Sequence, residues 1–264
     1  MGVLTLPILE ALAVGALSGL VGTLMVLGRR VFFAESLSHG MFPGAVLGVV
    51  AADALGAHLS DGLIVGSVLA CLPLALFMHH LSTLPGVSST AAAGTTLTLG
   101  FALGIFLLRL FQPLPLHVDS FLVGSLTTVN HRDVLIATAV AGLSLLMLLA
   151  WRRPLIHTYF DPLTAAHPTA FDALTLALIC ATMAAVIPAV GTILSLALLV
   201  APAAGLRPWV RSPEALLVAA AAVGIGLALG GLLLASALQV SAGGSIALLA
   251  GAFYLLSLAL RALG

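Results

Sequence analysis

Long apolar runs, separated by short polar segments, constrain this chain more than any other feature. Candidate membrane-spanning runs lie at residues 6–27, 38–52, 62–78, 88–108 and 134–150, and two longer runs follow at 173–206 and 215–260. A helix needs about 20 mainly apolar residues to cross a bilayer. Only 7% of the residues are charged, whereas soluble domains carry about a quarter. We therefore expect an all-α integral membrane protein, surrounded by the lipid bilayer.

The two longest runs each contain a signal that breaks a helix. At about 1.5 Å per residue, each run is longer than the ~30 Å hydrocarbon core. Pro188 and Gly191 interrupt the first run, and the stretch from Ser236 to Ser245 interrupts the second. Splitting both predicts a polytopic bundle of about eight to nine helical segments, some of them short or broken. We treat residues 1–264 as a single transmembrane domain.

Arginine placement predicts the orientation of this bundle, because the chain has no lysine. If nine segments alternate, one side of the membrane receives Arg29, Arg30, Arg152, Arg153, Arg207, Arg211 and Arg261. The other side receives Arg109 and Arg132. The positive-inside rule then places the N-terminus outside and the C-terminus in the cytoplasm. Residues 151–172 become the largest cytoplasmic loop, and residues 111–133 an external segment that includes a short surface helix.

The usual sequence motifs of enzymes are missing. The sequence contains no phosphate-binding G-x-x-x-x-G-K-[ST], no H-E-x-x-H and no G-x-S-x-G. We therefore expect no catalytic residues and no bound cofactor. The formal net charge is zero, which leaves no electrostatic attraction for nucleic acid. An integral membrane enzyme ranks below a transport function.

Glu35 and His39 are the most distinctive polar residues, because they stand four residues apart beside an apolar run. Residues at this spacing share one helix face. A carboxylate and an imidazole together suit divalent manganese, iron or zinc. Two ligands do not complete such a site, but a second copy with its own pair on a shared axis would. The structural alternative pairs Glu35 with Arg29 or Arg30 and leaves His39 near the membrane interface.

Other histidines fit solvated positions better than metal sites. His117 with Asp119 forms either a weak external entry site or an ordinary solvated loop, and the loop is favoured. The same applies to His58 with Asp61 in a short external turn. We assign no metal to the remaining histidines considered, which are His79, His80, His157 and His167.

The stretch GLVGTLMVLGRRVFFAESLSHGMFPGAVLGVV resembles the zinc/manganese/iron-type metal ABC transporter permease family. The matching residues are Gly19, Gly22, Arg29, Arg30, His39, Pro43 and Gly44. Segments 118–134 and 190–217 are also similar to family segments, in the same order. The chain departs from the family pattern at Glu35, where aspartate is usual, and at Ala34, where glycine is usual.

The resemblance implies a transport function and a set of partners. Such permeases form a dimeric channel with a second permease subunit, identical or paralogous, and receive the metal from an extracellular metal-binding protein. A separate ATPase dimer binds ATP and powers import. The family's intramembrane metal ligands carry over to Glu35 and His39. Residues 158–172, with Asp161, Ala165 and Ala166, correspond to the segment that couples to the ATPase.

The expected cargo is a divalent metal, and the location is the bacterial inner (plasma) membrane. The sequence HGMFPG at residues 39–44 resembles the manganese-type version of the family motif, which implies manganese in preference to zinc or iron. One alternative is a vitamin or siderophore-type ABC permease, which would lack an acidic residue and a histidine near the second span. Another is an ion-coupled secondary transporter, which should show two corresponding halves. No convincing internal repeat supports that alternative.

Overall fold

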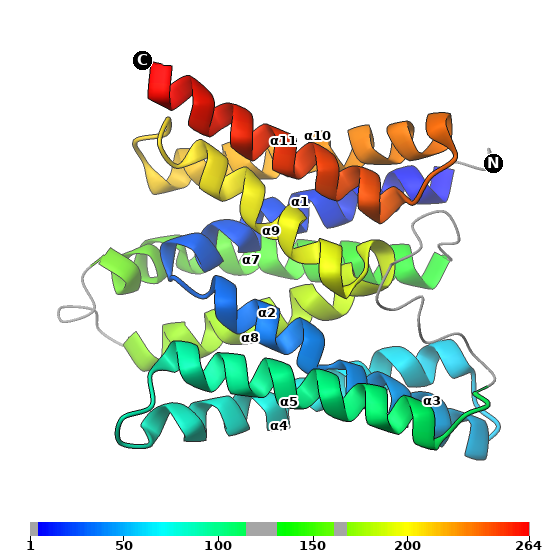
Figure 1. Cartoon of the computed structure of the whole chain (residues 1–264). Helices are drawn as coiled ribbons and strands as arrows, with labels where there is room; N and C mark the ends of the chain where they lie inside the picture. Colours follow the sequence, from blue (N-terminus) through cyan, green and yellow to red (C-terminus); the bar gives the residue numbers. More distant parts are fainter. Residues whose placement is uncertain (1–4, 115–130, 161–167, 264) are drawn as a thin grey trace. The chain divides into compact units, whose positions relative to one another are not determined.

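The computed structural model describes residues 5–114, 131–160 and 168–263. Within these ranges the chain forms ten α-helices and no β-strand (Figure 1). Eight helical segments of the described chain are long and apolar enough to cross a membrane, counting residues 31–54 as one segment. The apolar run lengths in the sequence therefore predicted the fold class correctly, because lipid-exposed backbone must satisfy its hydrogen bonds within a helix.

The helices cluster into two compact units. Unit 1 comprises Met1–Arg30 with Val123–Gly264, and unit 2 comprises Val31–Leu122. The helices of unit 1 are α1 (Thr5–Leu27), α7 (His131–Phe160), α8 (Pro168–Val190), α9 (Thr192–Leu206), α10 (Pro213–Leu238) and α11 (Ala242–Leu263). Those of unit 2 are α2 (Val31–Gly40), α3 (Phe42–Ala54), α4 (Leu59–Thr83) and α5 (Ser89–Leu110). The assignment of residues 1–264 to one domain stays a prediction.

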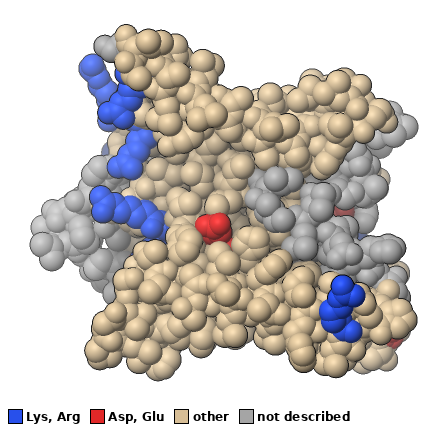
Figure 2. All heavy atoms as spheres, viewed as in Figure 1, with Lys and Arg blue, Asp and Glu red and all other residues tan. Residues whose placement is uncertain are grey.

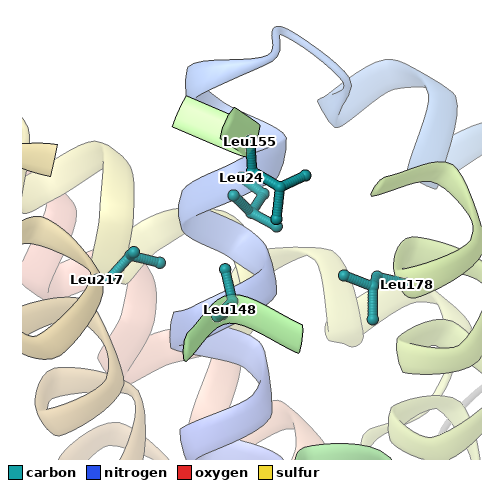
Figure 3. Close-up of a cluster of buried hydrophobic side chains, with 5 residues drawn as sticks. All are labelled: Leu24, Leu148, Leu155, Leu178 and Leu217. Carbon is teal, nitrogen blue, oxygen red and sulfur yellow. The ribbon is translucent and has the colours of Figure 1, made fainter. Parts of the chain in front are cut away.

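Helix α1 is the centre of unit 1, where it packs against α7, α8, α9 and α10. It lies especially close to α10, because a Cβ atom on Gly15 would lie 2.7 Å from the carbonyl oxygen of Gly224. Small residues allow such close contact between helices in lipid. Toward the C-terminal end of α1, leucine side chains from α1, α7, α8 and α10 form a buried cluster (Figure 3). Its members are Leu24, Leu148, Leu155, Leu178 and Leu217.

Unit 2 is built on a second glycine contact, between α3 and α4. Gly44 and Gly48 of α3 face Gly66 and Gly62 of α4, and a Cβ atom on Gly48 would lie 2.9 Å from the Cα atom of Gly66. Helix α2 packs mainly against α5. The unit therefore holds α2 on a framework of closely packed helices.

The two expected helix breaks are present. Gly191 separates α8 from α9 with a φ of 93°, and Gln239 ends α10 with a φ of 55°. Both angles lie in the left-handed region, which ends a right-handed helix. Arg29 also has a φ of 55° and lies in the turn between α1 and α2. The sequence did not indicate this turn conformation, because residues other than glycine seldom adopt a positive φ angle.

Two expected boundaries are wrong. The run predicted at 38–52 belongs to a longer segment that begins at Val31, and this segment is divided at Met41 into α2 and α3. Pro43 stands in the first turn of α3, where its missing N–H is tolerated. Continuing α2 through it would bring the proline ring against the carbonyl of His39.

The predicted cytoplasmic loop at 151–172 is also shorter than expected. Helix α7 continues to Phe160 after non-helical backbone angles at Trp151 (φ −121°, ψ 17°). Pro154, which follows three residues later, fits the first turn of the continued helix. Helix α8 then begins at Pro168. Asp161, Ala165, Ala166 and His167 lie outside the described residues, as do His117, Asp119 and the predicted external surface helix.

Candidate metal centre

Glu35 and His39 both lie on α2, four residues apart, so the predicted sharing of one helix face holds. Both side chains are partly exposed. The two groups interact electrostatically. In the described part of the chain, no ion pair is found for Glu35. The helix thus presents a carboxylate and an imidazole together.

Aromatic contacts hold the imidazole of His39 in place. The ring meets Phe101 of α5 edge-on, with centroids 5.6 Å apart and planes at 86°. Phe101 in turn stacks on Phe42, at 6.1 Å and 27°. The Nδ1 atom of His39 is buried and has no hydrogen-bond partner among the described residues. Because buried polar atoms are nearly always bonded, this ring nitrogen is uncommitted and available to a ligand.

The hydroxyl groups on α2 are engaged by the backbone. Ser36 Oγ lies 2.8 Å from the carbonyl oxygens of Phe32 and Ala93, the second of which is on α5. Ser38 Oγ donates to the carbonyl oxygen of Glu35 at 2.9 Å. Both serines are buried. Their hydroxyl groups are therefore already bonded to backbone carbonyl oxygens, unlike the Nδ1 atom of His39.

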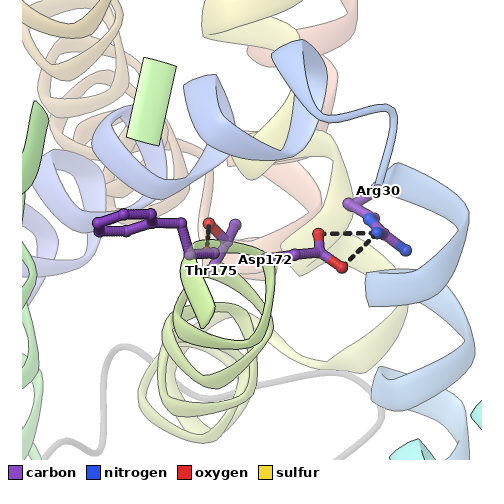
Figure 4. A network of polar contacts seen from close by, with 4 residues as sticks. Arg30, Asp172 and Thr175 are labelled. Atoms are coloured by element: carbon purple, nitrogen blue, oxygen red, sulfur yellow. Dashed lines mark hydrogen bonds and ion pairs between the residues drawn. The ribbon is translucent and has the colours of Figure 1, made fainter. Parts of the chain in front are cut away.

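Arg30 forms its ion pair with Asp172 and not with Glu35. Its Nη2 atom donates to the two carboxylate oxygens of Asp172 at 2.7 and 2.6 Å (Figure 4). The two side chains are 35% and 30% exposed. Next to them, Thr175 Oγ1 donates to the carbonyl oxygen of Phe171 at 3.0 Å. The alternative in which Arg30 pairs with Glu35 is therefore not observed.

Tyr159 of α7 lies near this ion pair. Burial raises the pKa of its phenol, and the charges of Asp172 and Arg30 act on it in opposite directions. The phenol of Tyr159 consequently stays neutral at physiological pH. The charges in this part of unit 1 come from Arg30 and Asp172.

The described residues contain no group of three or more histidine, cysteine, aspartate or glutamate side chains placed to hold a metal. His58, His79 and His80 are exposed near the ends of α4. A tetrahedral or octahedral ion needs more ligands than the α2 pair provides. Any stable coordination by this pair requires ligands from elsewhere.

Sequence reasoning missed Glu10, which lies within the first apolar run. Its side chain is 1% exposed in α1, and one carboxylate oxygen has no hydrogen-bond partner among the described residues. It interacts electrostatically with Asp133 of α7. A single acidic residue inside a membrane-spanning run was the available signal, because such residues are costly in lipid.

Comparisons with known proteins place the chain among transport permeases. The profile of the ABC 3 transport family matches residues 2–261. The zinc transport system membrane protein TroC of Treponema pallidum is 30% identical over 225 residues, which cover 82% of this chain and 74% of that protein. The manganese import system permease protein ScaB of Streptococcus gordonii is 27% identical over 256 residues, covering 95% and 88%. The solved structure of PsaBC from Streptococcus pneumoniae in complex with Fab has a TM-score of 0.85 at 26% identity, covering 97% of this chain and 91% of that chain.

Proposed function

Because this chain belongs to the ABC 3 transport family, we propose that it is the membrane-spanning permease of an importer for a divalent transition metal. The observation that carries the proposal is the pair on α2, where His39, with its unpartnered Nδ1 atom, stands one helical turn from Glu35 and interacts with it electrostatically. Carboxylate and imidazole are the ligand types that suit manganese, iron and zinc. The metal is cargo, and Glu35 and His39 are its ligands on the path.

Two copies of the α2 pair would supply four ligands, so the working unit is a dimer of permease chains. An incomplete site on each chain also fits transport, because a cargo site must release its ion as readily as it binds it. A separate ATPase dimer hydrolyses ATP on the cytoplasmic side, and residues 158–172 contact it. An extracellular metal-binding protein delivers the ion. The chain itself binds no cofactor and catalyses no reaction.

Manganese is the proposed cargo, with zinc second. The sequence at residues 39–44, HGMFPG, favours manganese, and ScaB is named for manganese import. TroC is named for zinc transport, which keeps zinc as the competitor. Both relatives come from bacteria, which supports a place in the bacterial plasma membrane.

Uptake by proteoliposomes that contain the chain, its ATPase and its binding protein tests this function. Glu35→Ala and His39→Ala are each expected to abolish ATP-driven manganese uptake while the complex still assembles. Matched controls are Asp53→Ala and His58→Ala, because both residues are exposed and belong to the same unit. Uptake that survives both α2 substitutions would overturn the proposal, and zinc uptake exceeding manganese uptake would overturn the choice of metal.

A further inference from the structure

A cleft of about 480 Å³ opens in unit 1 where α1, α9 and α11 end. Val26 of α1 and Ala204 of α9 form part of its wall, and Arg207 follows α9 directly. The last turns of α11 contribute Tyr254, Leu258 and Arg261. The lining of the cleft is therefore mostly apolar, apart from one phenol and two guanidinium groups.

The two guanidinium groups of the cleft are suited to a phosphate. No aspartate or glutamate lines the cleft, and neither Arg207 nor Arg261 has an ion-pair partner among the described residues. A guanidinium group binds phosphate oxygens through two parallel N–H groups. The Tyr254 hydroxyl provides a further hydrogen-bond donor.

A tryptophan next to the cleft indicates its depth in the membrane. Trp209 is 52% exposed, and its Nε1 atom donates to Ser257 Oγ of α11 at 2.8 Å. Ser257 Oγ in turn donates to the carbonyl oxygen of Gly205. Tryptophan with an anchored N–H and an exposed ring is typical of the headgroup region. The cleft accordingly lies at the level of lipid headgroups.

The basic surface continues beyond this cleft. A second cleft of about 420 Å³ shares Arg207 and adds Arg211, again without an acidic lining residue. Figure 2 shows arginine side chains gathered at the edge of the view where α9 and α11 end. The positive-inside rule places this edge at the cytoplasmic leaflet, where anionic lipids attract basic residues. We propose that the cleft lined by Arg207 and Arg261 binds the phosphate headgroup of an anionic phospholipid.

Native mass spectrometry of the chain purified with its ATPase tests this proposal, with added phosphatidylglycerol or phosphatidylcholine as the probe. Phosphatidylglycerol should be retained in preference to phosphatidylcholine. The double variant Arg207→Gln/Arg261→Gln should bind phosphatidylglycerol about 25-fold more weakly, since each basic residue near an anionic lipid contributes about fivefold. Arg261→Gln alone should weaken phosphatidylglycerol binding about fivefold. This single variant replaces the double variant in the test if the double variant does not fold. Arg153→Gln should have no effect, because that exposed arginine lines neither cleft.

Three results would overturn the proposal. Equal retention of the two lipids, or unchanged affinity in the arginine variants, would exclude a headgroup site. Displacement of the lipid by inorganic phosphate at the same concentration would indicate a site for free phosphate. Loss of the ATPase from the double variant, with unchanged lipid affinity, would identify the arginines as a surface for a protein partner.

Discussion

Arg30 and the α2 pair of Glu35 and His39 lie within ten residues of each other in the sequence, but they differ in whether they have bonding partners. Arg30, the last residue of the first segment of unit 1, donates hydrogen bonds to both carboxylate oxygens of Asp172. Glu35 and His39 lie on α2 of unit 2, where Glu35 has no ion pair among the described residues and His39 keeps a buried nitrogen without a partner. Arg30 is paired within unit 1, and the α2 pair has no such partner among the residues that the structure describes.

This difference separates side chains that are paired within unit 1 from side chains that have no partner among the described residues. A charge removed from water is costly unless a partner compensates it. Asp172 compensates Arg30, so that pair contributes to the stability of unit 1. The α2 pair leaves its compensation to something outside the described chain, and a divalent cation has the right charge and ligand preference.

The largest effect is expected when Glu35 loses its charge. Glu35→Gln keeps the size of the side chain, and manganese uptake should fall about a hundredfold, since even groups that only support a metal ligand contribute about 10- to 100-fold. Thermal unfolding should be unchanged, because no ion pair of Glu35 is broken in the described structure. Proteoliposome uptake and a melting curve of the same preparation measure both. Normal manganese uptake by Glu35→Gln would contradict the idea that the α2 pair differs in function from the Arg30–Asp172 pair.

A packing change in unit 1 should lower the stability of the protein and leave its metal affinity almost unchanged. Gly224→Ala brings a methyl group against Gly15 in the contact between α1 and α10, and such overpacking costs about 1–3 kcal/mol. Gly226→Ala, on the same helix, is the matched control, because a methyl group there meets no heavy atom within 4 Å. Alanine at that position should be neutral or slightly stabilising.

Denaturation of the two variants in the same micelles is the measurement. Equal stability of Gly224→Ala and Gly226→Ala would contradict the close contact between α1 and α10. Metal affinity of whichever variant remains folded should equal that of the parent chain, since neither glycine belongs to unit 2.

The Arg30–Asp172 pair should show a modest coupling energy. Its side chains are 35% and 30% exposed, and ion pairs with such access to water contribute about 0.2–1 kcal/mol. A double-mutant cycle with Arg30→Gln and Asp172→Asn measures this value from unfolding free energies. A coupling near zero would mean that the pair does not stabilise unit 1.

The smallest effect is expected from Glu35→Asp, which removes one methylene and keeps the charge. The ratio of manganese to zinc uptake should change by less than about tenfold, because the ligand type is retained. Competition between the two metals in one uptake assay measures the ratio. A complete loss of transport would show that the reach of the side chain matters as much as its charge.

Local sequence signals predicted much of the fold. The helix breaks at Gly191 and Gln239 were found because glycine, proline and polar residues interrupt long apolar runs there. The start of α2 was missed, since Glu35, Ser36, Ser38 and His39 lower the hydropathy of a segment that is nevertheless helical. The extension of α7 was missed because proline and arginine after Trp151 resemble a loop.

The sequence by itself determined an all-helical membrane protein and the shared helix face of Glu35 and His39, because run length and four-residue spacing are local properties. Only the tertiary structure decided the partners of these groups. Asp172 is 142 residues from Arg30, and Phe101 reaches His39 from another helix. Such contacts depend on how helices pack, so no local pattern distinguishes a polar side chain that will find a partner in the fold from one that will not.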